Sequence, residues 1–274
     1  MQHTGGGVQT QLKTGTILDR IVEARRGAVE HRKQVVPLPV LKMAVKRNEP
    51  PRDFAAVLSR NALNVIAELK KASPSRGLLR EDFPVEALAA SLEQAGAAAL
   101  SVLTEEQFFQ GALVNLTSAR KKTMLPVLRK DFIFDAWQVW EARAAEADSF
   151  LLIAAILDDS LLRDLLALGR ELGMEALVEV HTREELRRAL DAGARIAGVN
   201  NRDLRTFEVR VESSVELIQE VPEECLAVSE SGLRTHADLV RLRAAGFDAF
   251  LVGEQLMTAE NPAASLRVLL ERPA

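Results

Sequence analysis

The sequence has 274 residues, of which 47% are hydrophobic and 27% charged, as in an ordinary globular protein. Its net charge of -4 argues against nucleic acid or an anionic membrane as the main partner, although a few local cations could still hold a small anionic substrate. The single cysteine, Cys225, excludes an internal disulfide, which fits a reducing cytoplasm, the expected location, although a disulfide-free secreted protein would look the same. The longest apolar run, residues 150–157, is too short to span a membrane.

The N-terminal part of the chain is predicted to form an extension. Residues 1–14 lack the apolar stretch of a signal peptide and are expected to be a flexible tail. Residues 16–33 have the pattern of a charged amphipathic helix, and a Pro-containing stretch with room for a short helix follows. We expect this helical extension, about residues 15–60, to pack on the following domain, which gives one domain over residues 15–274.

Short β-like runs alternate with amphipathic helical patterns from about residue 63 onward. The predicted strands are residues 63–70, 98–103, 125–130, 149–155, 174–180, 195–200, 225–230 and 249–253. Strands that alternate with helices indicate a parallel sheet, and closure into a (βα)8 TIM barrel, which usually needs ~250 residues, satisfies the sheet edges. An open doubly wound sheet is the alternative, but no Gly-x-Gly-x-x-Gly follows the first strand. We therefore predict an α/β protein with a single (βα)8 barrel.

Polar side chains end five of the predicted strands. They are Glu68 and Lys70, Lys130, Glu179, Asn200 and Glu230. Any one of them could be a solvated strand end. In a barrel, however, the carboxyl ends of the strands meet at one mouth, where catalytic groups lie. Two lysines and three carboxylates at that mouth indicate acid–base pairs with shifted pKa values.

Two glycines follow the last two predicted strands, in SESG (229–232) and VGE (252–254). Barrels often bind phosphate with the loops after strands 7 and 8, where glycine lets backbone N–H groups approach an anion. Gly232 and Gly253 could each be a simple turn glycine, but the matched pair favours a phosphate site. The four histidines show no metal-ligand spacing, His181 is expected in a loop, and Cys225 is expected to be a small buried hydrophobe.

At these residues the sequence resembles the indole-3-glycerol phosphate synthase family. The matching segments are IAELKKASPSRG (66–77), SVLTEEQFFQGA (101–112), LPVLRKDFIFDAWQ (125–138), ALVEVHTREEL (176–186), GVNNRDLRTF (198–207), VSESGL (228–233) and LVGEQLM (251–257). The resemblance covers nearly the whole chain after residue 14, and the combination of ELKKASPS, LRKDF and NNRDL is specific.

The resemblance implies ring closure, decarboxylation and dehydration of 1-(2-carboxyphenylamino)-1-deoxyribulose 5-phosphate, with no metal or organic cofactor. Lys130 would be the general acid, Glu179 the general base in the dehydration, and Lys70 the partner of the substrate carboxylate. Residues implied to orient the lysines and the substrate hydroxyls are Glu68, Asn200, Glu230 and Ser231. Those implied at the phosphate end are Ser73, Arg202, Gly232, Gly253 and the backbone of Glu254. The implied apolar slot for the anthranilate ring consists of Phe109, Phe132 and Leu151.

Three positions depart from the family's usual pattern. Ala112 stands where Ser is frequent, Glu146 where Gly is usual, and Glu254 where some members carry Ser. The first two bear on local loop or helix-end geometry, whereas Glu254 removes a side-chain hydroxyl from the phosphate end.

Two other enzymes of the same pathway and a non-catalytic barrel fit the sequence less well. Phosphoribosylanthranilate isomerase and the α subunit of tryptophan synthase are enzyme alternatives, and the lysines in ELKKASPS and LRKDF disfavour both. A non-catalytic barrel that binds a sugar phosphate is disfavoured because it would have little reason to keep costly buried charges. We expect a small anionic substrate as the partner, and a monomer or weak homo-oligomer.

Overall fold

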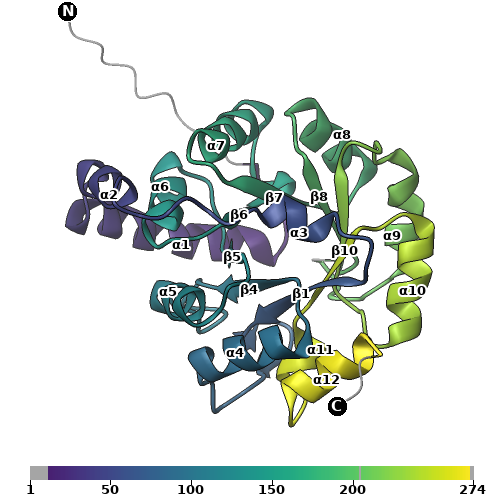
Figure 1. Ribbon diagram of the computed structural model, residues 1–274. Coiled ribbons are helices and arrows are strands. Elements are labelled where there is room, and N and C mark those ends of the chain that lie inside the picture. Colours follow the sequence, from purple (N-terminus) through teal and green to yellow (C-terminus); the bar gives the residue numbers. More distant parts are fainter. Residues whose placement is uncertain (1–11, 204, 272–274) are drawn as a thin grey trace, which may run out of the picture.

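Eight parallel strands form a closed barrel at the centre of the molecule (Figure 1). A computed structural model describes residues 12–203 and 205–271. The barrel strands are β1 (Asn64–Leu69), β4 (Ala99–Leu103), β5 (Val127–Lys130), β6 (Ser149–Ile153), β7 (Glu175–Val180), β8 (Ile196–Asn200), β9 (Leu226–Glu230) and β10 (Ala249–Val252). Because β1 pairs with both β10 and β4, the sheet has no free edge. The predicted (βα)8 barrel is confirmed, and the open sheet is excluded.

Helices surround the barrel (Figure 1). After the first strand they are α4 (Val85–Ala95), α5 (Leu113–Lys122), α6 (Ala136–Ala144), α7 (Asp159–Glu171), α8 (Arg183–Asp191), α9 (Glu212–Leu217), α10 (His236–Ala245), α11 (Glu254–Met257) and α12 (Pro262–Leu269). Local sequence sets several of their ends. The side chain of Asp158 accepts from Leu161 N at the start of α7, and Thr235 and Asp238 form a capping box on α10. The helical patterns that were predicted from the sequence thus start at residues suited to cap them.

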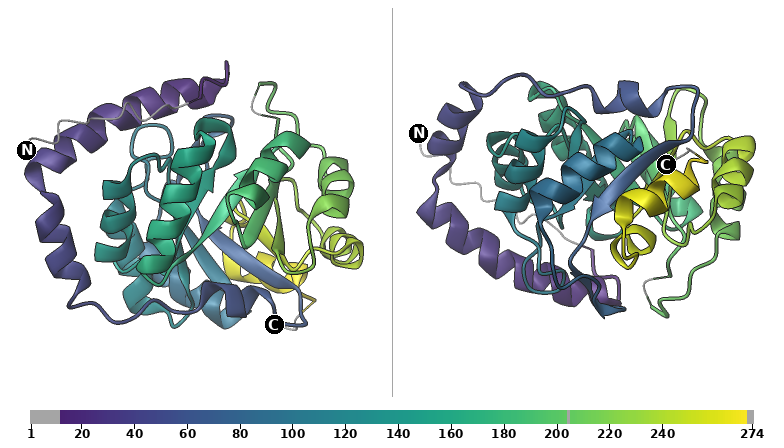
Figure 2. Two further views of the ribbon diagram at one scale, coloured as in Figure 1. Left: turned by 90° about the horizontal axis from the view of Figure 1, so that it is seen from above. Right: turned by 60° about the horizontal axis from the view of Figure 1, so that its bottom comes forward.

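The N-terminal extension wraps around the barrel. It contains α1 (Ile17–Val35), α2 (Leu38–Val45) and α3 (Phe54–Leu58). The left view of Figure 2 shows α1 across one end of the barrel and the following segment passing to the other end, where α3 leads into β1. The predicted tail falls mostly on residues 1–11, which lie outside the described part, but Thr14 Oγ1 donates to Asp19 Oδ1 at 2.9 Å. That bond lies within the extension, which is tied to the barrel by the bond from Leu12 N to Ile156 O at 3.3 Å and by the bond from Arg25 to Asp131.

Three details differ from the sequence prediction. The strand expected over 149–155 ends at Ile153, and a 3₁₀ turn, η1 (Ala154–Ile156), follows it. A two-stranded hairpin, β2 (Ala72–Ser73) and β3 (Gly77–Leu78), is inserted in the loop after β1. A second 3₁₀ turn, η2 (Ile218–Glu220), extends α9. These pieces are too short to give a hydrophobic period, so the sequence pattern did not predict them.

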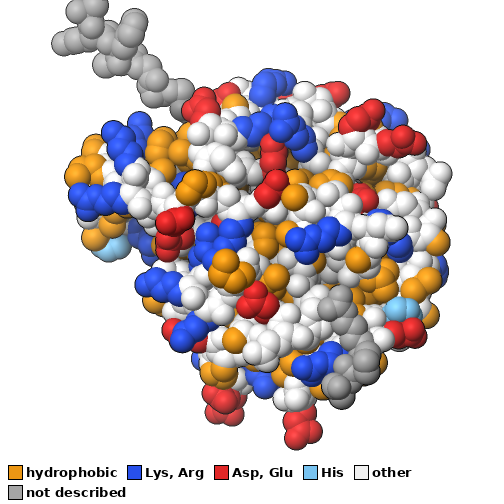
Figure 3. All heavy atoms as spheres, in the orientation of Figure 1, with side chains coloured by type: hydrophobic (Ala, Val, Ile, Leu, Met, Phe, Trp, Pro, Cys, Tyr) orange, Lys and Arg blue, Asp and Glu red, His pale blue; other side chains and the backbone are white. Residues whose placement is uncertain are grey.

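Charged side chains of both signs are interspersed over the face of the molecule seen in Figure 3. In the described part of the chain, no helix is both long enough and apolar enough to cross a membrane.

Candidate active site

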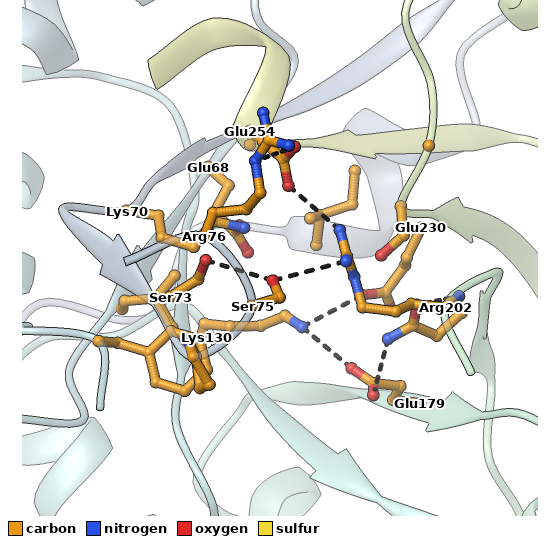
Figure 4. A pocket seen from close by; sticks show the side chains of 18 of the residues that line it. Glu68, Lys70, Ser73, Ser75, Arg76, Lys130, Glu179, Arg202, Glu230 and Glu254 are labelled. Atoms are coloured by element: carbon orange, nitrogen blue, oxygen red, sulfur yellow. Dashed lines mark hydrogen bonds and ion pairs between the residues drawn. The ribbon is translucent and has the colours of Figure 1, made fainter. Parts of the chain in front are cut away.

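A cavity of about 510 Å³ opens at the carboxyl ends of the barrel strands. The residues that end β5, β8 and β9 line it, together with the loops after β1, β8 and β10 (Figure 4). Helix α1 adds Ile17, Leu18 and Ile21 to its wall. The N-terminal extension therefore helps to form the cavity, in addition to packing on the barrel.

The ammonium group of Lys130, the last residue of β5, lies between two carboxylates (Figure 4). Its Nζ donates to Glu179 Oε2 at 3.0 Å and to Glu230 Oε2 at 3.1 Å. Asn200 Nδ2 donates to the other oxygen of Glu179 at 3.0 Å. The second oxygen of Glu230, Oε1, is buried and has no hydrogen-bond partner among the described residues. The site thus holds a charged lysine beside one fully bonded and one partly bonded carboxylate.

These contacts separate the pKa values of the two carboxylates. Burial alone would raise the pKa of Glu179, but Lys130, His181 and the hydrogen bond from Asn200 lower it to about 2. Burial raises the pKa of Glu230 to about 7, and the attraction of Lys130 only partly opposes it. Burial alone would lower the pKa of Lys130, yet the charges of Glu179 and Glu230 raise it above its ordinary value. In the empty cavity Lys130 is therefore an ammonium, and Glu230 is the carboxylate that exchanges a proton near neutral pH.

Two glycines make room for buried carboxylates. A Cβ at Gly198 on β8 would lie 2.2 Å from Glu230 Oε1, and one at Gly253 would lie 2.2 Å from Glu68 Oε1. Glu68 in β1 is 4% exposed, and its Oε1 lies 2.6 Å from Lys70 Nζ. Any side chain at Gly198 or Gly253 would push these carboxylates out of place.

A second charged network surrounds Arg129 of β5, whose side chain does not line the cavity although its partner Asp131 does. The fully buried Arg129 donates through Nη2 to Asp131 Oδ2 at 2.9 Å and to Glu141 Oε2 at 2.7 Å. Arg25 of α1 donates to the same Asp131 oxygen at 2.6 Å. Burial alone would raise the pKa of Asp131, but Arg25 and Arg129 hold it below its ordinary value. This network ties α1 to the residue directly after Lys130.

One wall of the cavity is apolar. The rings of Phe109 and Phe132 are 5.9 Å apart and tilted by 38°. Leu151 of β6 and the α1 residues Leu18 and Ile21 line the same cavity. Phe132 lies beyond the end of β5, so it reaches the cavity from a loop and not from a continued strand. A flat aromatic group fits such a wall.

The opposite end of the cavity carries two arginines. Arg202, just after β8, donates through Nη2 to Glu254 Oε2 at 3.1 Å and through Nη1 to Ser75 Oγ at 3.5 Å. Arg76 Nε lies 3.3 Å from Glu254 Oε1. The hydroxyls of Ser73 and Ser75 are 3.5 Å apart (Figure 4). Guanidinium and hydroxyl donors that converge in this way suit a phosphate group.

Comparison with known proteins agrees with this geometry. Residues 18–269 match the family described as indole-3-glycerol phosphate synthase. The chain belongs to the indole-3-glycerol phosphate synthase family. The family's enzyme from Variovorax paradoxus is 47% identical over 263 residues, which cover 93% of this chain and 99% of that protein. The enzyme from Chloroherpeton thalassium is 49% identical over 253 residues, 91% of this chain and 97% of that protein.

Solved structures with little sequence similarity share the barrel. 3-Hexulose-6-phosphate synthase from Salmonella typhimurium covers 76% of this chain and 97% of its own, with a TM-score of 0.61 and 13% identity. An N-acetylmannosamine-6-phosphate 2-epimerase from Clostridium perfringens covers 76% and 93%, with a TM-score of 0.59 and 17% identity. These similarities show the fold alone.

All residues that the sequence predicted for the site line the one cavity. At the lysine end these are Glu68, Lys70, Lys130, Glu179, Asn200, Glu230 and Ser231, and the apolar wall contains Phe109, Phe132 and Leu151. At the arginine end they are Ser73, Arg202, Gly232, Gly253 and Glu254. Their individual roles stay predictions for this member of the indole-3-glycerol phosphate synthase family.

Several residues of the site were missed. Arg76 and Ser75 follow Ser73 in the segment KKASPSRG, so the loop that gave Ser73 could also have indicated them. His181 lies in a loop, as expected, and is not among the residues that line the cavity, but its Nε2 lies 3.4 Å from Glu179 Oε1 and its Nδ1 3.3 Å from Glu185 Oε2. Burial alone would lower the pKa of His181, yet these carboxylates raise it.

The structure gives other reasons for some predicted features. Gly232 has φ +81°, and a Cβ there would lie 2.3 Å from Val209 Cγ1, so glycine is required there whether or not an anion binds. Ala112 precedes α5 without a side-chain cap, and Glu146 has φ +64°. Both departures from the family pattern thus affect helix ends, as expected. Cys225 is buried, and burial raises the pKa of its thiol to about 11, as suits a small buried hydrophobe.

Within residues 12–203 and 205–271, no group of three or more His, Cys, Asp or Glu side chains is placed to hold a metal ion. The absence of a cofactor stays a prediction.

Proposed function

We propose that this chain converts 1-(2-carboxyphenylamino)-1-deoxyribulose 5-phosphate to indole-3-glycerol phosphate, with release of carbon dioxide and water. The observation that carries the proposal is the position of Lys130 between Glu179 and Glu230, in a cavity with an aromatic wall at one side and two arginines at the other. This substrate has an anthranilate ring, a carbonyl to be protonated, and a phosphate. Each part thus has a matching group in the cavity.

The first step needs an acid. The anthranilate carbon that bears the carboxylate attacks the ribulose carbonyl carbon, and the carbonyl oxygen takes a proton from Lys130 to become a hydroxyl. An ammonium has three N–H groups, and the described contacts of Lys130 use two, so one can face this oxygen. Loss of carbon dioxide leaves its bonding electrons in the ring and restores aromaticity. Lys70, beside Glu68, would pair with the carboxylate before it leaves.

The second step needs a base and an acid. Lys130, once it has regained a proton from solvent, protonates the hydroxyl, which leaves as water, and Glu179 takes the proton from the neighbouring carbon to complete the indole. While Lys130 is charged, it lowers the pKa of Glu179 and makes that carboxylate a weak base. Once Lys130 has given up its proton, that attraction is lost and Glu179 becomes a stronger base. The geometry thus supports a fixed order, in which Glu179 accepts a proton only after Lys130 has donated one.

The remaining residues would position these groups. Asn200 holds one oxygen of Glu179, and Glu230 holds Lys130 from the other side. Phe109, Phe132 and Leu151 would face the anthranilate ring, while Arg202, Arg76 and Ser73 would face the phosphate. Ser231, beside Gly232 in the same wall, would contact a substrate hydroxyl.

The test is turnover of the ribulose phosphate by the purified protein, followed by the absorbance and fluorescence of the indole product. Absence of turnover by the folded wild type would favour a non-catalytic phosphate-binding barrel. We then expect Glu179→Gln, which keeps the shape but cannot accept a proton, to accumulate a species that has lost carbon dioxide and still carries the hydroxyl. Rapid-quench mass analysis detects it.

The matched control is Glu184→Gln, which removes the same charge from the exposed first turn of α8 and should turn over like the wild type. If Glu179→Gln stalls with unreacted substrate instead, Glu179 only orients Lys130 and the base lies elsewhere, with Glu230 the next candidate.

A further inference from the structure

The arginine end of the cavity already contains an anion of its own. The carboxylate of Glu254, which begins α11 directly after Gly253, contacts two arginines from two different loops. Arg76 comes from the hairpin loop after β1, and Arg202 from the segment after β8. Figure 4 shows the side chain of Glu254 between these two guanidinium groups. The carboxylate thus uses the donors that a phosphate would need.

The ion pairs of Glu254 are more open to solvent than those at the lysine end. The side chains of Glu254, Arg202 and Arg76 are 26%, 21% and 59% exposed, whereas Glu230 beside Lys130 is 2% exposed. Exposed ion pairs are weak and easily exchanged, because water and salt screen them. The carboxylate of Glu254 can therefore leave the arginines without creating a buried unpaired charge.

We propose that Glu254 is a built-in competitor of the substrate phosphate and sets how tightly this end of the cavity binds anions. The proposal rests on the proposed function, which places the phosphate at Arg76 and Arg202. In the empty protein Glu254 neutralises the two arginines and holds their loops together. On binding, a phosphate dianion replaces it, because it offers a second charge and more acceptor oxygens than one carboxylate.

The two roles of Glu254 can be separated by substitution. Glu254→Gln keeps an amide oxygen that can still accept from Arg202 or Arg76, but it removes the negative charge that opposes an incoming phosphate. Glu254→Ser removes both the acceptor oxygen and the negative charge, and it adds a hydroxyl donor. If competition dominates, both variants bind phosphate more tightly than the wild type. If loop ordering dominates, Glu254→Ser binds phosphate more weakly.

The experiment is isothermal titration of the full chain with inorganic phosphate, in a buffer without other multivalent anions. We expect Glu254→Gln to bind phosphate about five- to tenfold more tightly, as two exposed ion pairs are replaced by neutral contacts. The KM for the ribulose phosphate should also be lower in Glu254→Gln than in the wild type. Added salt should reduce the difference in phosphate affinity between the two proteins. The control Glu171→Gln, an exposed position on α7 outside the cavity, loses the same charge and should bind phosphate like the wild type.

Each outcome decides the proposal. Phosphate affinity that is unchanged or weaker in Glu254→Gln overturns it, whatever the affinity of Glu254→Ser, as does the absence of phosphate binding to every variant. Tighter binding by Glu254→Gln with weaker binding by Glu254→Ser supports the proposal and shows that Glu254 also orders the two loops. If the phosphate affinities change as expected but the wild type does not close the ring, this inference stands and the proposed function fails. If the ring closes but the affinities are equal, the proposed function stands and Glu254 has no competing role.

Discussion

Arg129 and Lys130 are neighbours on β5, and each is a cation between two carboxylates. Arg129 is fully buried whereas the Lys130 side chain is 13% exposed, and the two differ in the number of N–H groups that they leave unbonded. Arg129 points away from the cavity and donates to Thr104, Gln138, Asp131 and Glu141, which uses four of its five N–H groups. Lys130 points into the cavity and, in the described part of the chain, uses two of three. Beside it Glu230 Oε1 is buried and unpartnered.

Similar charged groups therefore stabilise the fold on one face of β5 and form a reactive site on the other. All four carboxylate oxygens of Asp131 and Glu141 accept hydrogen bonds, and the Arg129 side chain does not line the cavity, so this network offers a substrate no free acceptor and mainly holds the fold together. The Lys130 cluster keeps one donor and one acceptor beside a cavity, and that is the minimum for moving a proton in and out. Substitutions at Lys130 and at Arg129 test this difference.

The largest expected effect is on turnover. We expect Lys130→Met to lower kcat for ring closure by about 100- to 10,000-fold, since it removes a positioned acid. The fold should survive, because without Lys130 the buried Glu230, whose pKa is already about 7, can take up a proton. Steady-state kinetics measure kcat, and circular dichroism shows whether the variant is folded. More than a tenth of wild-type kcat in the variant would show that another group is the acid.

Arg129→Met is the matched variant on the other face of β5. It removes one donor from Asp131 and one from Glu141, which keep Arg25 and Arg32 as ion-pair partners, so we expect a cost of about 3 kcal/mol, the low end for breaking a buried ion pair. Urea unfolding should therefore separate the two variants, with Arg129→Met far less stable than Lys130→Met. Equal stabilities would mean that the two networks do not differ in the way we describe.

Strand patterns alone could place Lys130, Glu179 and Glu230 at one mouth, because the carboxyl ends of parallel strands must meet there. The family resemblance added Ser73 and Arg202. Neither the strand patterns nor the family resemblance could predict the contacts that residues outside the strands make with the site. The hairpin that carries Arg76 is too short for a hydrophobic period, and the place of α1 over the cavity depends on the long-range bond from Arg25 to Asp131. The pKa values of Glu179 and Glu230 also depend on burial in the folded protein. The sequence therefore could not show which of the two carboxylates has the lowered pKa and which the raised one.

A smaller effect concerns pH. Glu230 has a pKa of about 7 in the folded protein and an ordinary value of 4.5, so the folded state holds its proton more tightly than the unfolded state. Stability from this group is therefore full below about pH 4.5 and is lost as the pH rises toward 7. We expect the wild type to lose about 1–3 kcal/mol more than Glu230→Gln between roughly pH 5 and pH 8. Lys130, Glu179 and Glu68 face Glu230, but both proteins retain them.

Urea unfolding at the two pH values measures this difference. Glu179, whose pKa is lowered to about 2, contributes stability that is lost only on acidification below pH 4.5, outside this window. His181, whose pKa is raised, weakens both proteins as the pH rises. Parallel pH profiles for the wild type and Glu230→Gln would show that the proton is not held on Glu230.

The smallest effect strengthens the structural face of β5 without touching the cavity. Helix α6 carries Glu141 and Gln138, the partners of Arg129, and it ends in a left-handed turn at Glu146, where Glu146 N donates to Arg143 O and Ala147 N donates to Ala142 O. The same pair of bonds ends α4 at Gly96 and α10 at Gly246, with glycine in the left-handed position.

A side chain in that conformation is strained, whereas glycine adopts it freely but loses more entropy on folding. The carboxylate of Glu146 acts on Arg52 and Arg143 only through longer-range attraction, so we expect relief of the backbone strain to dominate and Glu146→Gly to raise the free energy of unfolding by about 0.5–1 kcal/mol. Ala167→Gly is the opposing control, because Ala167 is an exposed residue inside α7 without a positive φ, and glycine there should cost about 1 kcal/mol. Turnover should equal the wild type in both variants, and a loss of stability in Glu146→Gly would mean that contacts of the Glu146 side chain outweigh its backbone strain.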